Sequence, residues 1–362
     1  MNRFIRLVYF YPLNIIRFGL AAGVLLFHYG TAYYPFNIPI LKTIIEHSSF
    51  RVSFFFFISG FVMCLVYAKQ GENLLTRDFY IKRFTRIFPV YWLAFIATLI
   101  LVIFVNHASP KGLVIILHFL GLQSLNPGYV LDLNFTAWSI SVDLVFYLLF
   151  PLLLKWLLKI PDSKIFGVTI IVWLVQTLQH IFFVENIGGS GKVAQEFVDS
   201  FALWHLPTFF VGMVSARLII AENLPETFKR YATFYFMLSV LFFIYLVLIP
   251  NPILKYVHNG LLSPVFAVFV MTLFYDKSGI AKFLSLKPLS RLGDLSFGIF
   301  IYQYPVWLVC SYLFTQEFKQ TSWFFTIYCG SLLIFCWMAN LFFEKPILNF
   351  LRLNLRKEPI KT

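Results

Sequence analysis

Residues 51–68 read RVSFFFFISGFVMCLVYA, and this stretch decides the class of fold. It carries one charge, at its first position, and five of its residues are phenylalanine. A helix that spans a bilayer needs about 20 mostly apolar residues, because the hydrocarbon core is about 30 Å thick and each residue advances about 1.5 Å. The stretch therefore predicts a membrane-spanning helix.

The rest of the 362-residue chain has the same character. Hydrophobic residues make up 60% of it and aromatic residues 20%, whereas charged residues make up 12%, about half the share found in soluble domains. So little polar surface excludes a soluble globular enzyme. The net charge of +13 would suggest nucleic-acid binding in a soluble protein, so the positions of the charges decide its meaning.

Ten segments are long and apolar enough to span. They are residues 13–33, 51–68, 88–105, 138–158, 164–184, 201–220, 231–249, 259–275, 295–315 and 322–343. Residues 112–122 are apolar but too short to cross, so we expect a re-entrant or interfacial helix there. The predicted fold is an all-α polytopic membrane protein of about ten transmembrane helices. We expect one transmembrane domain over residues 1–350 and a short basic cytoplasmic tail over residues 351–362.

The cations are distributed unevenly between the two sides of this arrangement. Of the 29 lysines and arginines, 22 lie in the termini and one set of alternate loops, six lie in the other set, and Arg17 lies within the first segment. Cytoplasmic loops carry such an excess, so both termini are predicted to be cytoplasmic. The positive charge is then explained by topology and membrane lipids, and no nucleic-acid partner is expected.

The first segment contains two costly polar residues, Arg17 and His28. An ionisable group inside a span costs at least about 2.5–3.5 kcal/mol and is a candidate functional residue. Eleven residues are close to three helical turns, so the two side chains are expected on nearly the same face, roughly 16 Å apart along the axis. Arg17 could also snorkel to the headgroups, and His28 could be a hydrogen-bonded packing residue. A neutral histidine can act as a general base.

Asp143, in TAWSISVDLVFYLLFP, is the second costly group. If its helix enters from the outer side, Asp143 lies at the depth estimated for His28 and could orient that histidine, as the carboxylate of a catalytic triad does. It could instead cap the start of its helix with Ser139 or Ser141. Trp138 is typical of the membrane interface.

Arg83 and Arg86 lie in the stretch RDFYIKRFTRIFPVYW, at the cytoplasmic mouth of the third segment. Three residues apart, they share a helix face and could hold phosphates, although contact with anionic lipids would also explain them. The sequence has no pair of His or carboxylate residues at ligand spacing on one predicted helix, so no metal site is expected.

These stretches resemble the integral-membrane acyltransferase 3 family, and six motifs occur in the family's order. The motifs are Arg17 with His28, VSFFFFISGFVM at 52–63, Arg83 with Arg86 before IFPVYW, Trp138 and Ser139 with FYLLFP, LGDLSFGIFIYQYPVW at 292–307, and NLFFEKP at 340–346. Two residues depart from the pattern. Asp143 stands where the family usually has Glu, and Gln303 stands where it usually has His, so position 303 cannot act as an acid or base.

The resemblance implies an O-acyltransferase that moves an acyl group, most often acetyl, from cytoplasmic acetyl-CoA to a hydroxyl of a cell-surface or exported polysaccharide. Arg17, Arg83 and Arg86 would bind the anionic end of CoA, and His28 would be the general base, with Asp143 orienting it. Trp138, Ser139, Tyr302 and Gln303 are assigned to substrate binding. The acceptor is a carbohydrate, free or lipid-linked, and the implied location is a bacterial inner (plasma) membrane.

The hydrolase-like extension of some family members is expected to be absent. An alternative from another class is a transporter or flippase for a lipid-linked or anionic substrate, which would use Arg17, His28 and Asp143 as a polar pathway. A purely structural membrane subunit would leave the buried charges unexplained. The sequence names neither the acceptor sugar nor the acyl group, and it leaves open whether transfer is direct.

Overall fold

The computed structural model describes residues 11–355 of the chain. This part is 82% helical and contains no strand. The ten helices at the predicted spans are α2 (Pro12–Leu25), α4 (Arg51–Tyr67), α5 (Thr76–Phe104), α7 (Trp138–Lys159), α8 (Asp162–Asn186), α10 (Leu206–Ile220), α12 (Ala232–Leu248), α13 (Ser263–Tyr275), α16 (Ser296–Leu313) and α18 (Ser322–Ala339). Shorter helices connect them: α3 (Pro39–Glu46), α6 (Gly112–Leu120), α9 (Lys192–Ser200), α11 (Glu226–Arg230), α14 (Ile280–Leu284), α15 (Lys287–Asp294) and α17 (Gln316–Lys319). A further helix, α19 (Lys345–Leu355), follows α18.

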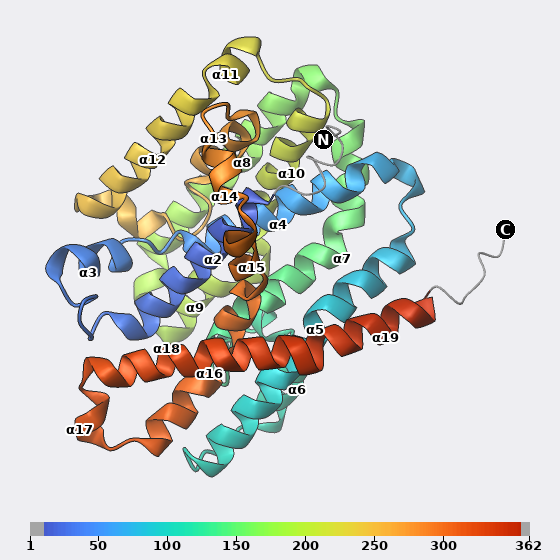
Figure 1. Cartoon of the computed structure of the whole chain (residues 1–362). Helices are drawn as coiled ribbons and strands as arrows, with labels where there is room; N and C mark the ends of the chain where they lie inside the picture. The colour runs from blue at the N-terminus through green and yellow to red at the C-terminus, as the bar shows by residue number, and fades with distance from the viewer. Residues whose placement is uncertain (1–10, 356–362) are drawn as a thin grey trace.

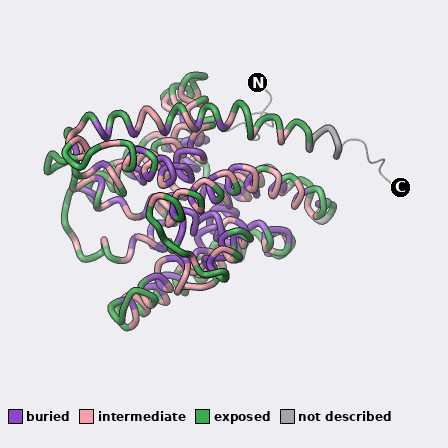
Figure 2. Tube along the Cα trace, turned by 90° about the horizontal axis from the view of Figure 1, so that it is seen from below, coloured by how far each residue is buried: buried purple, intermediate pink, exposed green. Residues whose placement is uncertain are grey.

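The prediction of an all-α polytopic membrane protein is confirmed. Within the described residues, seven helical stretches are long and apolar enough to cross a membrane. They are Pro12–Gly30, Arg51–Gly71, Thr76–Phe104, Phe135–Lys159, Asp162–Ser190, Lys192–Ile220 and Ser322–Phe350. The other three predicted spans are helices too, but α12 and α13 have only 17 and 13 residues. The helices form one bundle (Figure 1), with the buried positions at its centre and exposed ones on its outer helices (Figure 2).

The tightest helix pair is α4 against α10, and glycines make it possible. A Cβ at Gly60 would overlap the carbonyl of Phe209, and a Cβ at Gly212 would overlap the carbonyl of Phe57. Small residues let two helix backbones approach closely where lipid supplies no hydrophobic drive between helices. Each helix thus uses its own glycine to seat the backbone of the other.

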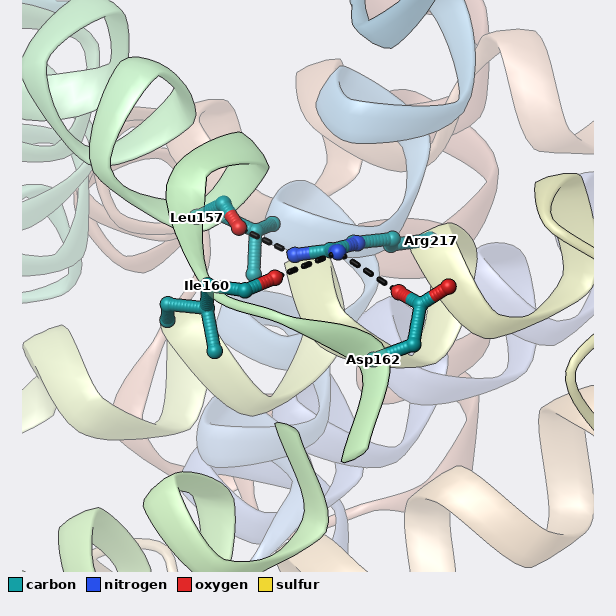
Figure 3. Close-up of polar contacts among 4 residues, drawn as sticks. All are labelled: Leu157, Ile160, Asp162 and Arg217. Atoms are coloured by element: carbon teal, nitrogen blue, oxygen red, sulfur yellow. Dashed lines mark hydrogen bonds and ion pairs between the residues drawn. The ribbon is translucent and has the colours of Figure 1, made fainter. Parts of the chain in front are cut away.

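Arg217, near the end of α10, fastens the end of α7. Its guanidinium donates hydrogen bonds to the carbonyls of Leu157 and Ile160, the latter at 2.7 Å, and pairs with Asp162 at 2.7 Å (Figure 3). The last carbonyls of a helix have no partner within the helix, so this side chain satisfies two of them. The turn from α7 to α8 is thereby fixed to α10.

Two features differ from the sequence expectation. The third span was expected to begin at residue 88, but the basic stretch before it forms the first turns of the same helix, α5, which has 29 residues. Its polar part is helical because it packs on the core: Phe79 stacks on Phe150, and Arg83 lies over the ring of Tyr67 at 5.1 Å. Hydropathy alone could not predict this, since it detects only the apolar part of a helix.

The second difference is the connection before α7. It includes the nine-residue helix α6, which fits the prediction of a helix too short to cross. The segment that follows folds into the bundle: Asn134 donates to the carbonyl of Ile301 at 2.9 Å, and Thr136 donates to that of Phe300 at 3.1 Å. Both side chains are buried. The helix α7 therefore starts among other helices rather than at an outer edge of the bundle.

Candidate active site

The largest group of functional candidates lines one internal cavity of about 480 Å³. Its walls come from α2, α4, α5, α7, α15 and α16, and from the consecutive segments η9 (Asn340–Glu344) and α19. The candidates in the lining are Arg17, Arg83, Arg86, Ser139 and Asp143. The structure thus brings together residues that are 126 positions apart at most in the sequence. The cavity-lining face of α4 consists of Val52, Phe55, Ser59 and Val62, with neighbours of each.

Asp143 is surrounded by cations in this cavity. Arg17, Arg86 and Arg83 are its charged neighbours, and Ser59 is a neutral polar neighbour. Its Oδ1 is buried without a hydrogen-bond partner in the part of the chain that the structure describes. The charged residues of the lining are Arg17, Arg83, Arg86 and Lys345 against Asp143, Asp294 and Glu344. The three arginines around Asp143 give this part of the cavity a positive charge that suits an anionic ligand, because arginine forks bind phosphate and carboxylate well.

Arg83 is held by aromatic rings. Its guanidinium lies over Tyr67, Phe79 and Tyr147, at 5.1, 5.8 and 5.7 Å from the ring centroids. Such cation–π contacts fix a guanidinium without using its N–H donors. The Nε of Arg83 is buried and has no acceptor among residues 11–355, so it remains available for a ligand in the cavity.

His28 lies outside the lining of this cavity. It belongs to a π-helical turn, η1 (Leu26–Gly30), which continues α2. The expectation that His28 and Arg17 share a helix face assumed a regular α-helix, and a π-helical turn rotates the chain differently. Its ring lies 4.7 Å from that of Phe135, and its charged neighbour is Arg51. The structure therefore groups Asp143 with Arg17 and not with His28. The reason is the inward fold of the segment before α7, which removes the basis for placing the two residues at equal depth.

The assigned substrate residues are divided. Ser139 lines the cavity and donates to the carbonyl of Thr136 at 3.3 Å. Trp138 is buried against Phe56 and His205, at ring distances of 5.9 and 5.3 Å. Neither Trp138 nor the pair Tyr302 and Gln303 is among the residues that line the cavity.

Tyr302 and Gln303 are fully buried in α16. Gln303 donates to the carbonyl of Phe300 at 2.7 Å, while its Oε1 has no partner among the described residues. The hydroxyl of Tyr302 is likewise buried without a partner in residues 11–355. These polar atoms could receive a hydrogen bond from water or substrate only if α16 shifts or the neighbouring side chains move.

Sequence reasoning missed Arg51 and three charged residues of the lining, Asp294, Glu344 and Lys345. Arg51 looks like the flanking cation of a span, but it is 8% exposed and packs against α2. Glu344 lines the cavity and accepts a hydrogen bond from Asn340 at 3.1 Å within a second π-helical turn. Its position inside the closing NLFFEKP motif was the available signal.

Among the described residues, no group of three or more His, Cys, Asp or Glu side chains is placed to hold a metal ion.

Comparison with known proteins gives a family match. Residues 10–341 match a family model described as "Acyltransferase domain". A protein named Acyltransferase MdmB from Streptomyces mycarofaciens is 29% identical over 185 residues, which cover 47% of this chain and 46% of that protein. The Peptidoglycan O-acetyltransferase OatA of Listeria monocytogenes is 23% identical over 283 residues, 70% of this chain and 44% of OatA.

A Staphylococcus aureus protein with the provisional name of O-acetyltransferase is 23% identical over 335 residues, 86% of this chain and 53% of its own length. The chain therefore spans about half the length of the curated relatives it matches. No solved structure matches it.

Proposed function

Since the chain belongs to the acyltransferase-domain family, we propose that it is a membrane-embedded O-acyltransferase. In this proposal it moves an acetyl group from cytoplasmic acetyl-CoA to a hydroxyl of a cell-surface or exported polysaccharide. The observation that carries the proposal is the cavity in which Arg17, Arg83 and Arg86 converge from two helices on Asp143.

The donor site follows from the charges of the cavity. Arg86 is exposed while Arg83 is buried, so an anion that enters at Arg86 meets further cations inward. The phosphates of CoA are such an anion, and charge-assisted hydrogen bonds from arginine to phosphate are among the strong ones. Asp143 would hold Arg17 in place between turnovers.

The acyl end would lie at the apolar part of the lining. Val52 and Phe55 continue the α4 face past Ser59, and Phe300 contacts Phe55 with ring centroids 5.9 Å apart. Val52 directly follows Arg51, the charged neighbour of His28. A thioester extended along α4 would thus end on the side of the bundle where His28 stands, and His28 would remove the proton of the acceptor hydroxyl.

The sidedness is part of the same proposal. We assign the protein to the inner (plasma) membrane with both termini cytoplasmic, in one domain over residues 1–350. The basic residues of 351–362 favour this side, although residues 356–362, like residues 1–10, lie outside the described part. Acetyl-CoA would then enter from the cytoplasm, and the acceptor would approach from the opposite side.

Transfer of radiolabelled acetyl tests the proposal. Inverted membrane vesicles from cells with the gene, with its His28→Ala variant and without the gene receive labelled acetyl-CoA, and alkali-labile label in glycan is counted. We expect label only with the intact gene, while His28→Ala inserts at normal levels because ten apolar helices hold the fold. Equal label in all three would reject acetyl transfer, and uptake of substrate without thioester consumption would favour a transporter.

A further inference from the structure

Arg51 is a buried cation with few partners. It is the first residue of α4 and 8% exposed, and its one hydrogen bond within the described chain runs from Nη2 to the carbonyl of Ile44 at 3.5 Å. No carboxylate pairs with it among residues 11–355. A guanidinium has five N–H donors, and burying one without a counter-ion is costly. A residue of this kind is expected to serve a ligand.

A gap in α2 accommodates this side chain. A Cβ at Gly23 would lie 2.5 Å from Nε and 2.8 Å from Cδ of Arg51, so the guanidinium occupies space that only glycine leaves open. Gly23 lies in the last turn of α2, immediately before the π-helical turn that holds His28. Arg51 is also the charged neighbour of that histidine. The cation and the proposed base are thus held by consecutive turns of one helix.

Arg51 also continues the cavity-lining face of α4. Phe55, Ser59 and Val62 line the cavity at spacings of four and three residues, which is one face of a helix. Arg51 stands four residues before Phe55 and therefore one turn further along the same face. A thioester that follows this face reaches Arg51 just after the last apolar contacts.

We propose that Arg51 stabilises the oxyanion of the tetrahedral intermediate, and this inference rests on the proposed acyl transfer. His28 takes the proton of the acceptor hydroxyl, and the acceptor oxygen forms a bond to the thioester carbonyl carbon. The carbonyl π electrons move to its oxygen, to which the guanidinium donates. Collapse of the intermediate re-forms C=O, breaks the C–S bond and releases the CoA thiolate, which takes the proton from His28.

Kinetics and stability of the full-length protein test this role together. Acetyl-CoA is titrated into vesicles that carry wild type or Arg51→Met, and the thermal midpoint of each purified protein is measured in detergent. Loss of one oxyanion donor lowers the rate about 10²–10³-fold, so we expect that fall in maximal rate with the half-saturating acetyl-CoA concentration changed less than about threefold. Because methionine fills the space without a charge, the thermal midpoint stays equal or rises.

Lys42→Ala is the matched control. Lys42 lies on α3, the helix before α4, where it is half exposed and pairs with Glu46 of the same helix. It should keep wild-type kinetics. An unchanged maximal rate in Arg51→Met overturns the inference. So does a change in the half-saturating acetyl-CoA concentration alone, because Arg51 would then bind the donor substrate rather than the intermediate. A lower thermal midpoint overturns it too, because it would show a structural role.

Gly23→Ala provides a second variant that leaves Arg51 in place. The new methyl group displaces the guanidinium, so we expect a fall in maximal rate and a lower thermal midpoint. In Gly23→Ala with Arg51→Ala, no side chain is left to meet the new methyl group, so the midpoint should recover relative to Gly23→Ala while the rate stays low. Failure of the parent proposal looks different: wild-type vesicles would then label no more glycan than gene-deleted ones.

Discussion

Asp143 and Arg17 should be energetically coupled, whereas Asp143 and His28 should not. The sequence suggested the second pair, and the structure places Asp143 among Arg17, Arg86 and Arg83. The perturbation is Asp143→Leu, alone and combined with Arg17→Met or with His28→Ala. Removing the carboxylate leaves Arg17 facing two other cations, while removing both partners leaves an apolar contact of similar size.

The magnitude follows from the position of the pair. Breaking a buried ion pair costs about 3–5 kcal/mol, but Arg17 and Asp143 form no ion pair or hydrogen bond with each other within residues 11–355 and interact through their charges alone. Both side chains are half-buried and line a cavity, so water offsets part of the loss, and Arg83 and Arg86 share the interaction. We therefore expect a coupling free energy of about 1–2 kcal/mol between positions 17 and 143, in the middle of the range for residues of one charge network.

The assay is a double-mutant cycle on the free energy of unfolding, measured by titrating dodecyl sulfate into mixed micelles and following helix content. Independent sites add within about 0.3–0.5 kcal/mol, which is the result expected for His28 with Asp143. A coupling below that limit for Arg17 with Asp143, together with a larger one for His28, would refute the placement and restore the pairing that the sequence suggested.

Three further outcomes are expected. Arg83→Ala should raise the half-saturating acetyl-CoA concentration about tenfold or more, since a charge-assisted hydrogen bond is worth about 1.5–3 kcal/mol. This concentration is measured from the acetyl-transfer rate as acetyl-CoA is titrated, and an unchanged value would exclude Arg83 from the donor site. Gly60→Ala should lower the free energy of unfolding by at least about 1–3 kcal/mol, because its Cβ overlaps a backbone carbonyl. The control is Gly167→Ala in an exposed helical position, where the new Cβ meets nothing within 4 Å; it should leave the thermal midpoint unchanged or higher. Arg217→Met should lower the free energy of unfolding by about 2–4 kcal/mol, because two carbonyls at the end of α7 lose their partner. Asp162→Asn should lower it by less than about 1 kcal/mol, because that carboxylate is 57% exposed. Equal losses in unfolding titrations would contradict the role of Arg217 at the end of α7.

The segments that become helices were predictable because hydropathy is a local property. Every one of the ten apolar segments is helical in the described structure, and the short apolar run before α7 is a helix too short to cross. The sequence pattern misplaced only the ends of some helices. In α5, the basic first turns are helical because aromatic rings pack on Arg83. Motif order likewise pointed to the family before any contact was known.

The composition of the cavity was only partly predictable. That Arg17 and Asp143 are unusual follows from the cost of charge in a membrane, which is a property of each residue by itself. Arg83 and Arg86 were identified by their spacing at the mouth of a span, which is also a local property. Which of them meet is a property of pairs distant in the chain. Estimating depth by counting residues assumed that α7 starts at an outer edge, and the buried hydrogen bonds of Asn134 and Thr136 remove that assumption.

The sequence by itself therefore determined that the chain is a bundle of membrane helices with costly polar residues in a family-typical order. The tertiary structure decided the partners: Asp143 with Arg17, His28 with Arg51, and Arg217 with the end of α7. The physical reason is that lipid exposure selects apolar residues one position at a time, whereas helix contacts depend on where each connection turns inward and which glycines let backbones meet.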